Sequence, residues 1–239
     1  MGTLINVAAV ILGGVLGRFI SAGAIKKYEA SLMHALGLCT LFIGISGVLS
    51  EMLVYENGAF SVTGTLLIIF SLVPGTLIGE LLRIEERLTV LGERIKKAVG
   101  ASKDARFVES FMANMLVICI GAMAIIGSLQ DGLTGDFSML AAKAALDCVI
   151  TLIFASTMGI GAAFAAIPLG IYQGSITLLA HVIQPFLSDA LIGDLSMMGS
   201  VLITGVGINL LWNKGIRLAN MLPAILGPVI YHLVILPLL

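Results

Sequence analysis

The sequence predicts an all-α, polytopic integral membrane protein, and three observations support this prediction. Hydrophobic residues make up 59% of the 239 residues and charged residues only 11%, whereas soluble domains carry about 25% charged residues. The apolar residues are gathered into long runs, and roughly 20 such residues in a helix cross a bilayer. The basic residues are concentrated in alternate connections between these runs. We therefore expect about eight transmembrane helices, with internal hairpin repeats and broken helices among them.

The apolar runs define the expected spans. They cover residues 3–22, 31–53, 60–82, 107–129, 195–212 and 218–239, together with a long run over 137–186 that holds two spans divided near Gly159–Ile160–Gly161. Residues 1–82 thus carry spans one to three and residues 107–239 carry spans four to eight. The intervening segment, 83–106, is the only long polar stretch, and the whole chain is expected to form one membrane domain.

The positions of lysine and arginine predict the orientation of the chain. Twelve of the 13 basic residues lie in or beside three connections: between spans one and two, between spans three and four, and between spans seven and eight. These three connections share one side of the membrane if there are eight spans. These residues are Arg18, Lys26, Lys27, Arg83, Arg87, Arg94, Lys96, Lys97, Lys103, Arg106, Lys214 and Arg217. The charged residues of the connections on the opposite side are all acidic. Because positive charge is retained in the cytoplasm, we expect both the N- and C-termini to lie outside.

The polar segment 83–106 reads as an amphipathic cytoplasmic helix. Apolar residues recur at helical spacing, at Ile84, Leu88, Leu91, Ile95 and Val99, with charges between them. Such a helix lies on the anionic inner leaflet or serves as a solvated linker between the two halves of the chain. The pattern does not separate these two interpretations.

Two sequence echoes indicate internal repeats. Gly2–Thr3–Leu4 recurs as Gly64–Thr65–Leu66, and at the same offset Gly13 matches Gly75 and Gly17 matches Gly79. Span four resembles span two more weakly, over 116–121 and 39–44. In the other half, the segment 168–172 of span six resembles 227–231 of span eight. We interpret these echoes as an assembly of helical hairpins whose glycines allow close helix packing.

Lys143 and Asp147 are the two ionisable residues near the centre of a span. They lie four residues apart and share one face of span five, and charges at this depth are costly enough to indicate function. The functional interpretation is a cation or proton site in which Asp147 binds the ion and Lys143 competes for the same carboxylate. The alternative is a static buried ion pair that fixes helix packing. Thr151, one turn further on, adds a hydroxyl of the kind that hard cations accept.

Span six is expected to be broken. Pro168 lacks a backbone N–H, and Gly170, Gln173, Ser175 and Thr177 follow it. Opened backbone at membrane depth lines protein or a wet cavity and often holds transporter sites, although a simple kink would explain the proline equally well. Span eight repeats the feature with Pro223 and Pro228, and Asn209 lies in a glycine-rich part of span seven.

Motifs of catalysis and of nucleic-acid binding were not found. The sequence contains no phosphate-binding glycine loop, no His-Glu-x-x-His motif and no nucleophile elbow, and it has no basic face with interleaved aromatic residues. The three cysteines, Cys39, Cys119 and Cys148, lie inside apolar runs without metal-ligand spacing. We therefore expect no enzyme activity, no catalytic residues, no cofactor, no bound metal and no nucleic-acid partner.

The sequence also resembles a known family, that of domain of unknown function 554, the YdfK/YqgA-like bacterial membrane proteins. The resemblance is carried by residues 1–18, by Pro74–Gly75–Thr76–Leu77–Ile78–Gly79–Glu80, and by the segments 205–211 and 216–224 near the end of the chain. It implies a multi-pass protein of the bacterial cytoplasmic membrane. The family carries a label of sodium channel or pump but supplies no catalytic motif.

These observations favour a secondary transporter or channel for a cation such as sodium or protons. Asp147 and Lys143 would form the central site, with Thr151, Gln173, Ser175, Thr177 and Asn209 around it and helix breaks at Pro168, Gly170, Pro223 and Pro228. The alternatives are a transporter of a small organic anion and a non-transport scaffold or signalling protein. The expected partners are the lipid bilayer and the transported solute, and the small size of one protomer is compatible with a homodimer.

Overall fold

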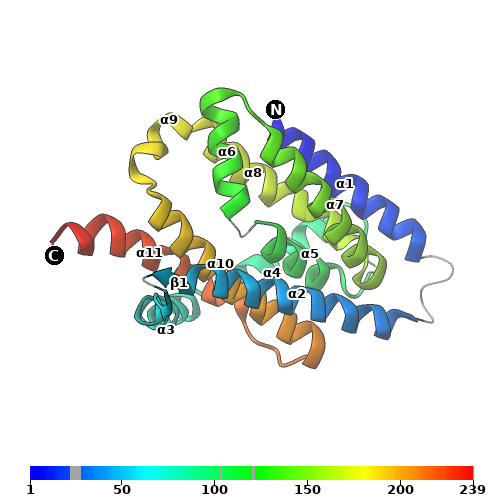
Figure 1. The fold of residues 1–239 in the computed structure, drawn as a ribbon. Coiled ribbons are helices and arrows are strands. Elements are labelled where there is room, and N and C mark those ends of the chain that lie inside the picture. Colours follow the sequence, from blue (N-terminus) through cyan, green and yellow to red (C-terminus); the bar gives the residue numbers. More distant parts are fainter. Residues whose placement is uncertain (22–27, 57, 103, 120–121, 239) are drawn as a thin grey trace. The chain divides into compact units, whose positions relative to one another are not determined.

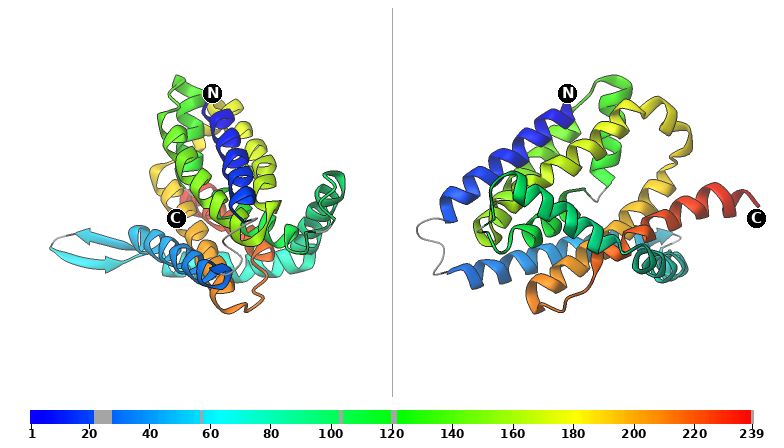
Figure 2. Two further views of the ribbon diagram at one scale, coloured as in Figure 1. Left: turned by 90° about the vertical axis from the view of Figure 1, so that its right-hand side faces the viewer. Right: turned by 180° about the vertical axis from the view of Figure 1, so that it is seen from behind.

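A computed structural model describes residues 1–21, 28–56, 58–102, 104–119 and 122–238. Lys26, Lys27 and Lys103, which enter the charge argument, lie outside the described residues. The chain divides into two compact units that interleave along the sequence. Unit 1 comprises residues 1–36, 87–119 and 123–185, and unit 2 comprises 37–86, 120–122 and 186–239. Figures 1 and 2 show the elements of each unit.

Long apolar helices dominate the described residues and confirm a polytopic α-helical membrane protein. Seven segments are long and apolar enough to cross a bilayer, and a bent pair of helices brings the number to as many as 8. The unbroken ones are α1 (Gly2–Ser21), α2 (Glu29–Met52), α3 (Thr65–Leu82), α7 (Ser138–Met158) and α10 (Asp189–Trp212). The bent pair is α5 (Phe107–Cys119) and α6 (Ala122–Thr134), whose axes differ by 62°. The predicted fourth span is therefore two helices at an angle.

Spans six and eight are both broken, and in span six the break lies before the predicted position. Span six begins with the 3₁₀ helix η2 (Ile160–Ala165) and continues as α8 (Ala166–Leu178). Pro168 lies in the first turn of α8, where its missing N–H leaves no helical hydrogen bond unmade. The opened backbone therefore precedes the proline, and residues 168–177, expected to be open, are regular helix. The elements α9 (Ala180–Ile183) and η3 (Gln184–Phe186) follow.

Span eight has the same order, with a 3₁₀ helix before an α-helix. It starts as η4 (Leu218–Ile225), which contains Pro223, and continues through α11 (Leu226–Ile230). The π-helix η5 (Tyr231–Ile235) and the 3₁₀ helix η6 (Leu236–Leu238) complete it. A 3₁₀ helix bonds each residue to the third one along and not to the fourth, as an α-helix does. In unit 1, the carbonyl of Ala162 in η2 accepts a side-chain hydrogen bond from Asn114.

A β-hairpin precedes α3 and was not predicted. Strand β1 (Leu53–Glu56) pairs antiparallel with β2 (Ala59–Val62), with Val54 opposite Ser61. The β-branched and aromatic residues of both strands favour this pairing, and Gly58 adopts a positive φ of 82° that suits a tight turn. The hairpin extends beyond the end of α2 in Figure 2. The third span consequently begins at Thr65 and not at Phe60, as the run of apolar residues alone had indicated.

Unit 1 is built around α1. This helix packs chiefly against α7 and also contacts η2 and α8, and the three long helices lie side by side in Figures 1 and 2. Glycines make the close approach possible, since a Cβ on Gly13 would lie 2.3 Å from the carbonyl oxygen of Cys148 and one on Gly14 2.3 Å from the Ala163 side chain. The core beside it holds Val10, Phe111 and Leu169 together with four further buried apolar residues.

Helix α4 (Ile84–Ala98) is the amphipathic helix predicted for the polar segment. Part of its apolar face packs against protein, because Leu88 and Ile95 contact the core of unit 1. Val90 and Leu91 remain 51% and 44% exposed. The helix is thus tied to unit 1 over residues 87–98 and is more than a solvated connection.

Unit 2 contains α2 from Gly37 onward, α3, α10 and the segment that follows α10. Helix α3 packs against η4 and α11, and a Cβ on Gly79 would lie 1.8 Å from the carbonyl oxygen of Asn220. Helix α2 packs against α10 through Gly44 and Gly47, which face Thr204 and Ser200. Two of the echoed pairs noted in the sequence are split between the units: α1 and α8 belong to unit 1, whereas α3 and α11 belong to unit 2.

Candidate functional site

Lys143 and Asp147 form a buried ion pair on α7. Their residues are 6% and 3% exposed, and the Lys143 Nζ donates to Asp147 Oδ2 across one helical turn. The same ammonium donates to the backbone carbonyl of Ile118 at 2.8 Å. That carbonyl is near the end of α5, where the bend to α6 leaves carbonyls without partners in the helix. Lys143 therefore lies between a carboxylate and a carbonyl from the broken span.

Two amides from other helices complete the central cluster. Asn6 of α1 donates through Nδ2 to Asp147 Oδ2 at 2.9 Å and to Gln173 Oε1 of α8 at 3.3 Å. Both amide residues are fully buried. Asn6 Oδ1 and Gln173 Nε2 have no hydrogen-bond partner among the described residues. Because buried polar atoms are rarely left unpaired, these two atoms are an acceptor and a donor available to a further polar group.

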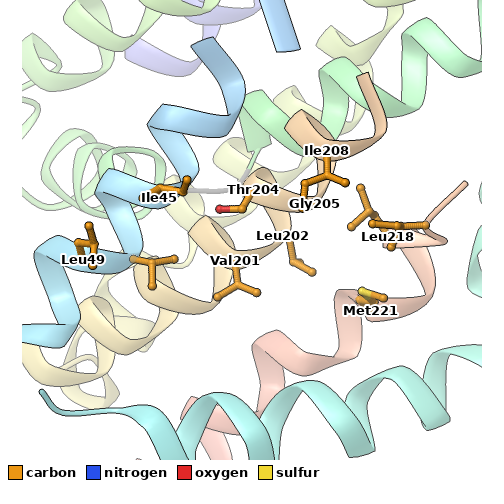
Figure 3. Close-up of a pocket in the computed structure, with 11 residues that line it drawn as sticks. Ile45, Leu49, Val201, Leu202, Thr204, Gly205, Ile208, Leu218 and Met221 are labelled. Atoms are coloured by element: carbon orange, nitrogen blue, oxygen red, sulfur yellow. The ribbon is translucent and has the colours of Figure 1, made fainter. Parts of the chain in front are cut away.

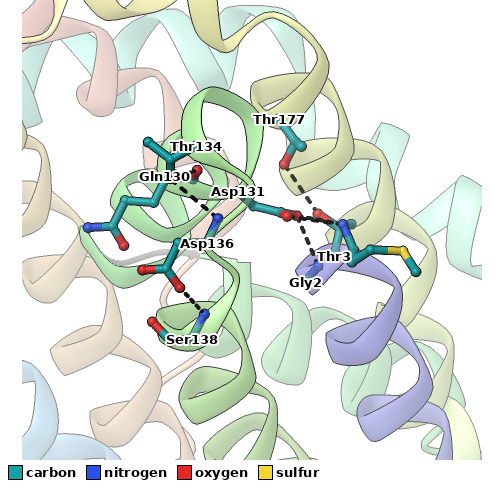
Figure 4. Close-up of polar contacts among 9 residues, drawn as sticks. Gly2, Thr3, Gln130, Asp131, Thr134, Asp136, Ser138 and Thr177 are labelled. Carbon is teal, nitrogen blue, oxygen red and sulfur yellow. Dashed lines mark hydrogen bonds and ion pairs between the residues drawn. The ribbon is translucent and has the colours of Figure 1, made fainter.

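A second polar cluster lies toward the end of unit 1 that is predicted to face outward. Thr3 and Thr177, one turn from Asn6 and Gln173, approach each other at 3.4 Å between their hydroxyl oxygens. Asp131 of α6 is buried and accepts from the Met1 nitrogen at 2.9 Å and from the Gly2 N–H at 2.9 Å. Figure 4 shows these contacts. Helix α6 also closes on α8, because a Cβ on Gly132 would lie 2.3 Å from the Thr177 carbonyl oxygen.

A third polar cluster lies toward the opposite end. Asn114 of α5 donates to Thr151 Oγ1 at 3.0 Å and to the carbonyl of Ala162 at 2.9 Å. Thr151 is one turn beyond Asp147 on α7, and Ala162 belongs to the 3₁₀ helix η2. Asn114 Oδ1 is buried without a partner among the described residues. Ser110, one turn earlier on α5, donates to the carbonyl of Gly159 at 3.0 Å.

These three clusters form a polar column through unit 1. We define the column as Thr3, Asn6, Asn114, Lys143, Asp147, Thr151, Gln173 and Thr177. Its members come from α1, α5, α7 and α8, and neighbouring clusters are about one helical turn apart. The column brings polar groups to a depth at which lipid-facing helices carry only apolar residues. It therefore provides sites at which a proton or a small cation would find oxygen ligands.

The structure brings together most of the site residues predicted from the sequence. Lys143, Asp147, Thr151, Gln173 and Thr177 all belong to the column. Ser175 does not, because it is exposed on α8 and donates to the carbonyl of Tyr172. Gly170 packs against Val7, so it provides space between α8 and α1.

Asn209 belongs to unit 2 and lies outside the column. Its amide exchanges two hydrogen bonds with the backbone of Ile216, at 2.8 and 3.0 Å, and so fixes the loop after α10. Pro223 and Pro228 are likewise in unit 2, in η4 and α11. These residues and Asp147 thus belong to different units.

Asn6, Asn114 and Asp131 are members or neighbours of the column that the sequence did not single out. Asn6 follows the spacing of the buried α1 residues Gly2, Val10 and Gly13, and this spacing is the signal that points to it. Among the described residues, no group of three or more His, Cys, Asp or Glu side chains is arranged to hold a metal ion.

Comparisons with known proteins place the chain in a family. The family model described as "Protein of unknown function (DUF554)" matches residues 1–233. The chain is 30% identical over 234 residues to "Uncharacterized membrane protein YdfK" of Bacillus subtilis (strain 168), which covers 98% of this chain and 96% of that protein. It is 32% identical over 233 residues to "Uncharacterized protein YqgA" of Escherichia coli (strain K12), which covers 95% and 93%. No solved structure matches the fold. The chain therefore belongs to the DUF554 family of multi-pass membrane proteins.

Proposed function

We propose that the chain is a small secondary transporter or channel that moves a cation through the polar column of unit 1. The single observation that supports this most is the central cluster, where a carboxylate, an ammonium and two amides meet between transmembrane helices. Charges and amides at this depth are costly and are rarely kept without a role. The unpaired atoms of Asn6 and Gln173 leave capacity to bind a further polar species.

Lys143 bears on which cation is transported. Its ammonium already occupies the position between the Asp147 carboxylate and the Ile118 carbonyl, where a sodium ion would find the oxygen ligands it needs. A sodium ion would have to displace this ammonium. A proton needs only to bind the Asp147 carboxylate, which becomes a neutral acid and releases Lys143 from the pair. We therefore expect the proton to be the transported cation and keep sodium as the alternative.

Flux measurements in proteoliposomes test this function. The purified chain is reconstituted into vesicles of phosphatidylethanolamine and phosphatidylglycerol that contain a pH-sensitive dye, and a potassium gradient with valinomycin sets the membrane potential. We expect the wild-type chain to carry protons, and Asp147→Asn to lower the rate by about tenfold or more, equivalent to at least about 1.4 kcal/mol in the barrier. Asp189→Asn is the matched control, because Asp189 is an exposed acid at the start of α10, and its flux should equal that of the wild type.

The same vesicles separate the rival functions. Uptake of radioactive sodium without proton movement would retain the transporter and replace the proton by sodium. Uptake of a small organic anion that is lost in Lys143→Ala would instead favour an anion transporter. Absence of all three fluxes from correctly folded wild-type protein would contradict the proposal. A scaffold that works through α4 would then be favoured. In that case, deletion of residues 83–106 should reproduce in cells the phenotype of losing the whole protein.

We further propose that both termini lie outside the cytoplasmic membrane of a bacterium. The distribution of basic residues supports this orientation, and the β1–β2 hairpin then lies outside while α4 lies inside. In a variant without Cys39, Cys119 and Cys148, a cysteine introduced by Ser61→Cys, on the exposed strand β2, should react with an impermeant maleimide added to intact cells. Ser102→Cys, which is also exposed, should react only after the membrane is opened. The opposite pattern would reverse the orientation.

A further inference from the structure

Unit 2 contains a cavity of about 420 Å³. Its walls come from α2, α10 and the segment that follows α10, as Figure 3 shows. Ile45 and Leu49 line it from α2, Val201 and Ile208 from α10, and Leu218 and Met221 from η4. The volume falls within the roughly 300–1,000 Å³ range of ligand pockets. The cavity is therefore large enough to hold a substantial apolar group.

The lining excludes a polar ligand. Aliphatic side chains form nearly all of it, and the polar side chain among them, Thr204, already donates its hydroxyl to the carbonyl of Ser200 at 2.9 Å. A polar solute would lose its hydrogen bonds to water without replacement, at a cost of about 1–3 kcal/mol for each unpaired group. An alkyl chain would lose nothing of this kind.

The position of the cavity indicates where such a chain comes from. Helices α2 and α10 and the segment Leu218–Leu238 are all candidate membrane spans, so the cavity lies at membrane depth. Ile45 and Leu49 are 37% and 47% exposed on unit 2. In a bilayer, the medium at this depth consists of the acyl chains of phospholipids.

The loop that contributes Ile216 to the cavity wall also carries basic residues, and these indicate an anionic headgroup. Asn209 holds the loop between α10 and η4 through its two hydrogen bonds to Ile216, and Ile216 itself lines the cavity. The same loop carries Lys214, which is exposed, and ends at Arg217. Arg217 forms an ion pair with Glu80 at 3.2 Å. For Lys214, no ion pair with a described residue is found. Lys214 is therefore placed to attract a phosphate at the predicted cytoplasmic surface.

We propose that this cavity binds one acyl chain of an anionic phospholipid from the inner leaflet, with the phosphate held at Lys214. The site is independent of the polar column, since all of its residues belong to unit 2. Asn209 then acts as a positioning residue: it keeps Ile216 in the wall of the cavity and fixes the loop that carries Lys214.

Photo-crosslinking in vesicles tests the site. The full chain is reconstituted into phosphatidylcholine vesicles that contain a trace of phosphatidylglycerol with a diazirine on its acyl chain, and labelled peptides are identified by mass spectrometry. We expect labelling to concentrate several-fold on the lining residues of α2 and α10. Val201→Phe, which fills the cavity, should remove this excess. Val73→Phe, on the exposed face of α3, is the matched control and should leave it unchanged.

A second pair of variants tests the headgroup. Lys214→Gln should abolish the preference for photoactive phosphatidylglycerol over photoactive phosphatidylcholine, whereas Lys97→Gln, an exposed lysine of α4, should preserve it. Uniform labelling along all spans would overturn the acyl-chain site. Equal labelling by both lipids in the wild type would overturn the anionic headgroup. In a separate measurement, Leu49→Cys in the variant without Cys39, Cys119 and Cys148 reports on a second protomer. Disulfides between two copies through this cysteine, with no lipid adducts on the lining residues, would show that a second protomer covers the cavity and would overturn the proposal.

Discussion

Lys143→Met is expected to lower the free energy of unfolding by about 3–5 kcal/mol, because it leaves the Asp147 carboxylate buried without an opposite charge. Asp147 is 3% exposed and would retain only the hydrogen bond from Asn6. The double variant Lys143→Met/Asp147→Leu should recover most of this loss, since it replaces both charges by apolar groups of similar volume. Unfolding in mixed micelles, followed by far-ultraviolet circular dichroism, measures both values.

The exposed pair of Arg217 and Glu80 provides the control for this prediction. Their side chains are 62% and 42% exposed, and exposed pairs contribute about 0–1 kcal/mol, so Arg217→Met should have little effect. The double variant also separates the two interpretations of the central pair. If the double variant is stable yet carries no protons, the pair serves transport. If it is stable and transports protons at the wild-type rate, the pair only fixes helix packing, and the proposed transport site at Asp147 is contradicted.

Gly79→Ala is expected to destabilise unit 2 by about 3 kcal/mol, at the upper end of the range for an overpacked site. The added Cβ would lie 1.8 Å from the carbonyl oxygen of Asn220, and a backbone atom cannot move aside by changing rotamer. The segment η4 would have to separate from α3, which removes the principal contact of that helix. The effect is measured as a decrease, relative to the wild type, in the temperature at which half of the protein in detergent remains folded.

Gly174→Ala is the matched control, because it makes the same change in a membrane helix with free space. The nearest atom to its added Cβ is Thr3 Cγ2, at 4.0 Å, and alanine is the better helix former by about 1 kcal/mol. We expect this variant to be as stable as the wild type or slightly more so. If the two variants behave alike, the close approach of α3 and η4 is not what holds unit 2 together.

Much of this fold follows from hydropathy alone. The prediction of about eight spans is confirmed, and the division near Gly159 matches the end of α7 at Met158. The hairpin before α3 was missed because Val54, Tyr55, Phe60 and Val62 are as apolar as a span, and a window of hydropathy cannot distinguish four-residue strands from the start of a helix. The bend between α5 and α6 was missed for a similar reason, since apolar residues continue on both sides of it.

The site was predictable in part. Lys143 and Asp147 were found because a charge in an apolar run is visible in one dimension. Asn6 and Asn114 were not assigned to the site, since an amide in a span is common and only tertiary packing shows that it reaches a carboxylate or a threonine. Ser175 and Asn209 were predicted as site residues, but Ser175 is exposed on α8 and Asn209 belongs to unit 2. Sequence proximity to a proline or a glycine does not reveal which way a side chain faces. The break in span six lies before Pro168 and not at it, because proline is tolerated in the first turn of a helix.

The 3₁₀ segments also affect how far each span reaches. A 3₁₀ helix rises about 2.0 Å per residue and an α-helix about 1.5 Å, so the six residues of η2 add about 3 Å and the eight residues of η4 about 4 Å. Each of these two segments is thus longer than the α-helix that the same residues would form. Rewinding these segments into α-helix would shorten them relative to a hydrocarbon layer of about 30 Å. We therefore expect the thickness of the surrounding bilayer to influence the winding of η2 and, through the Ala162 carbonyl, the side chain of Asn114.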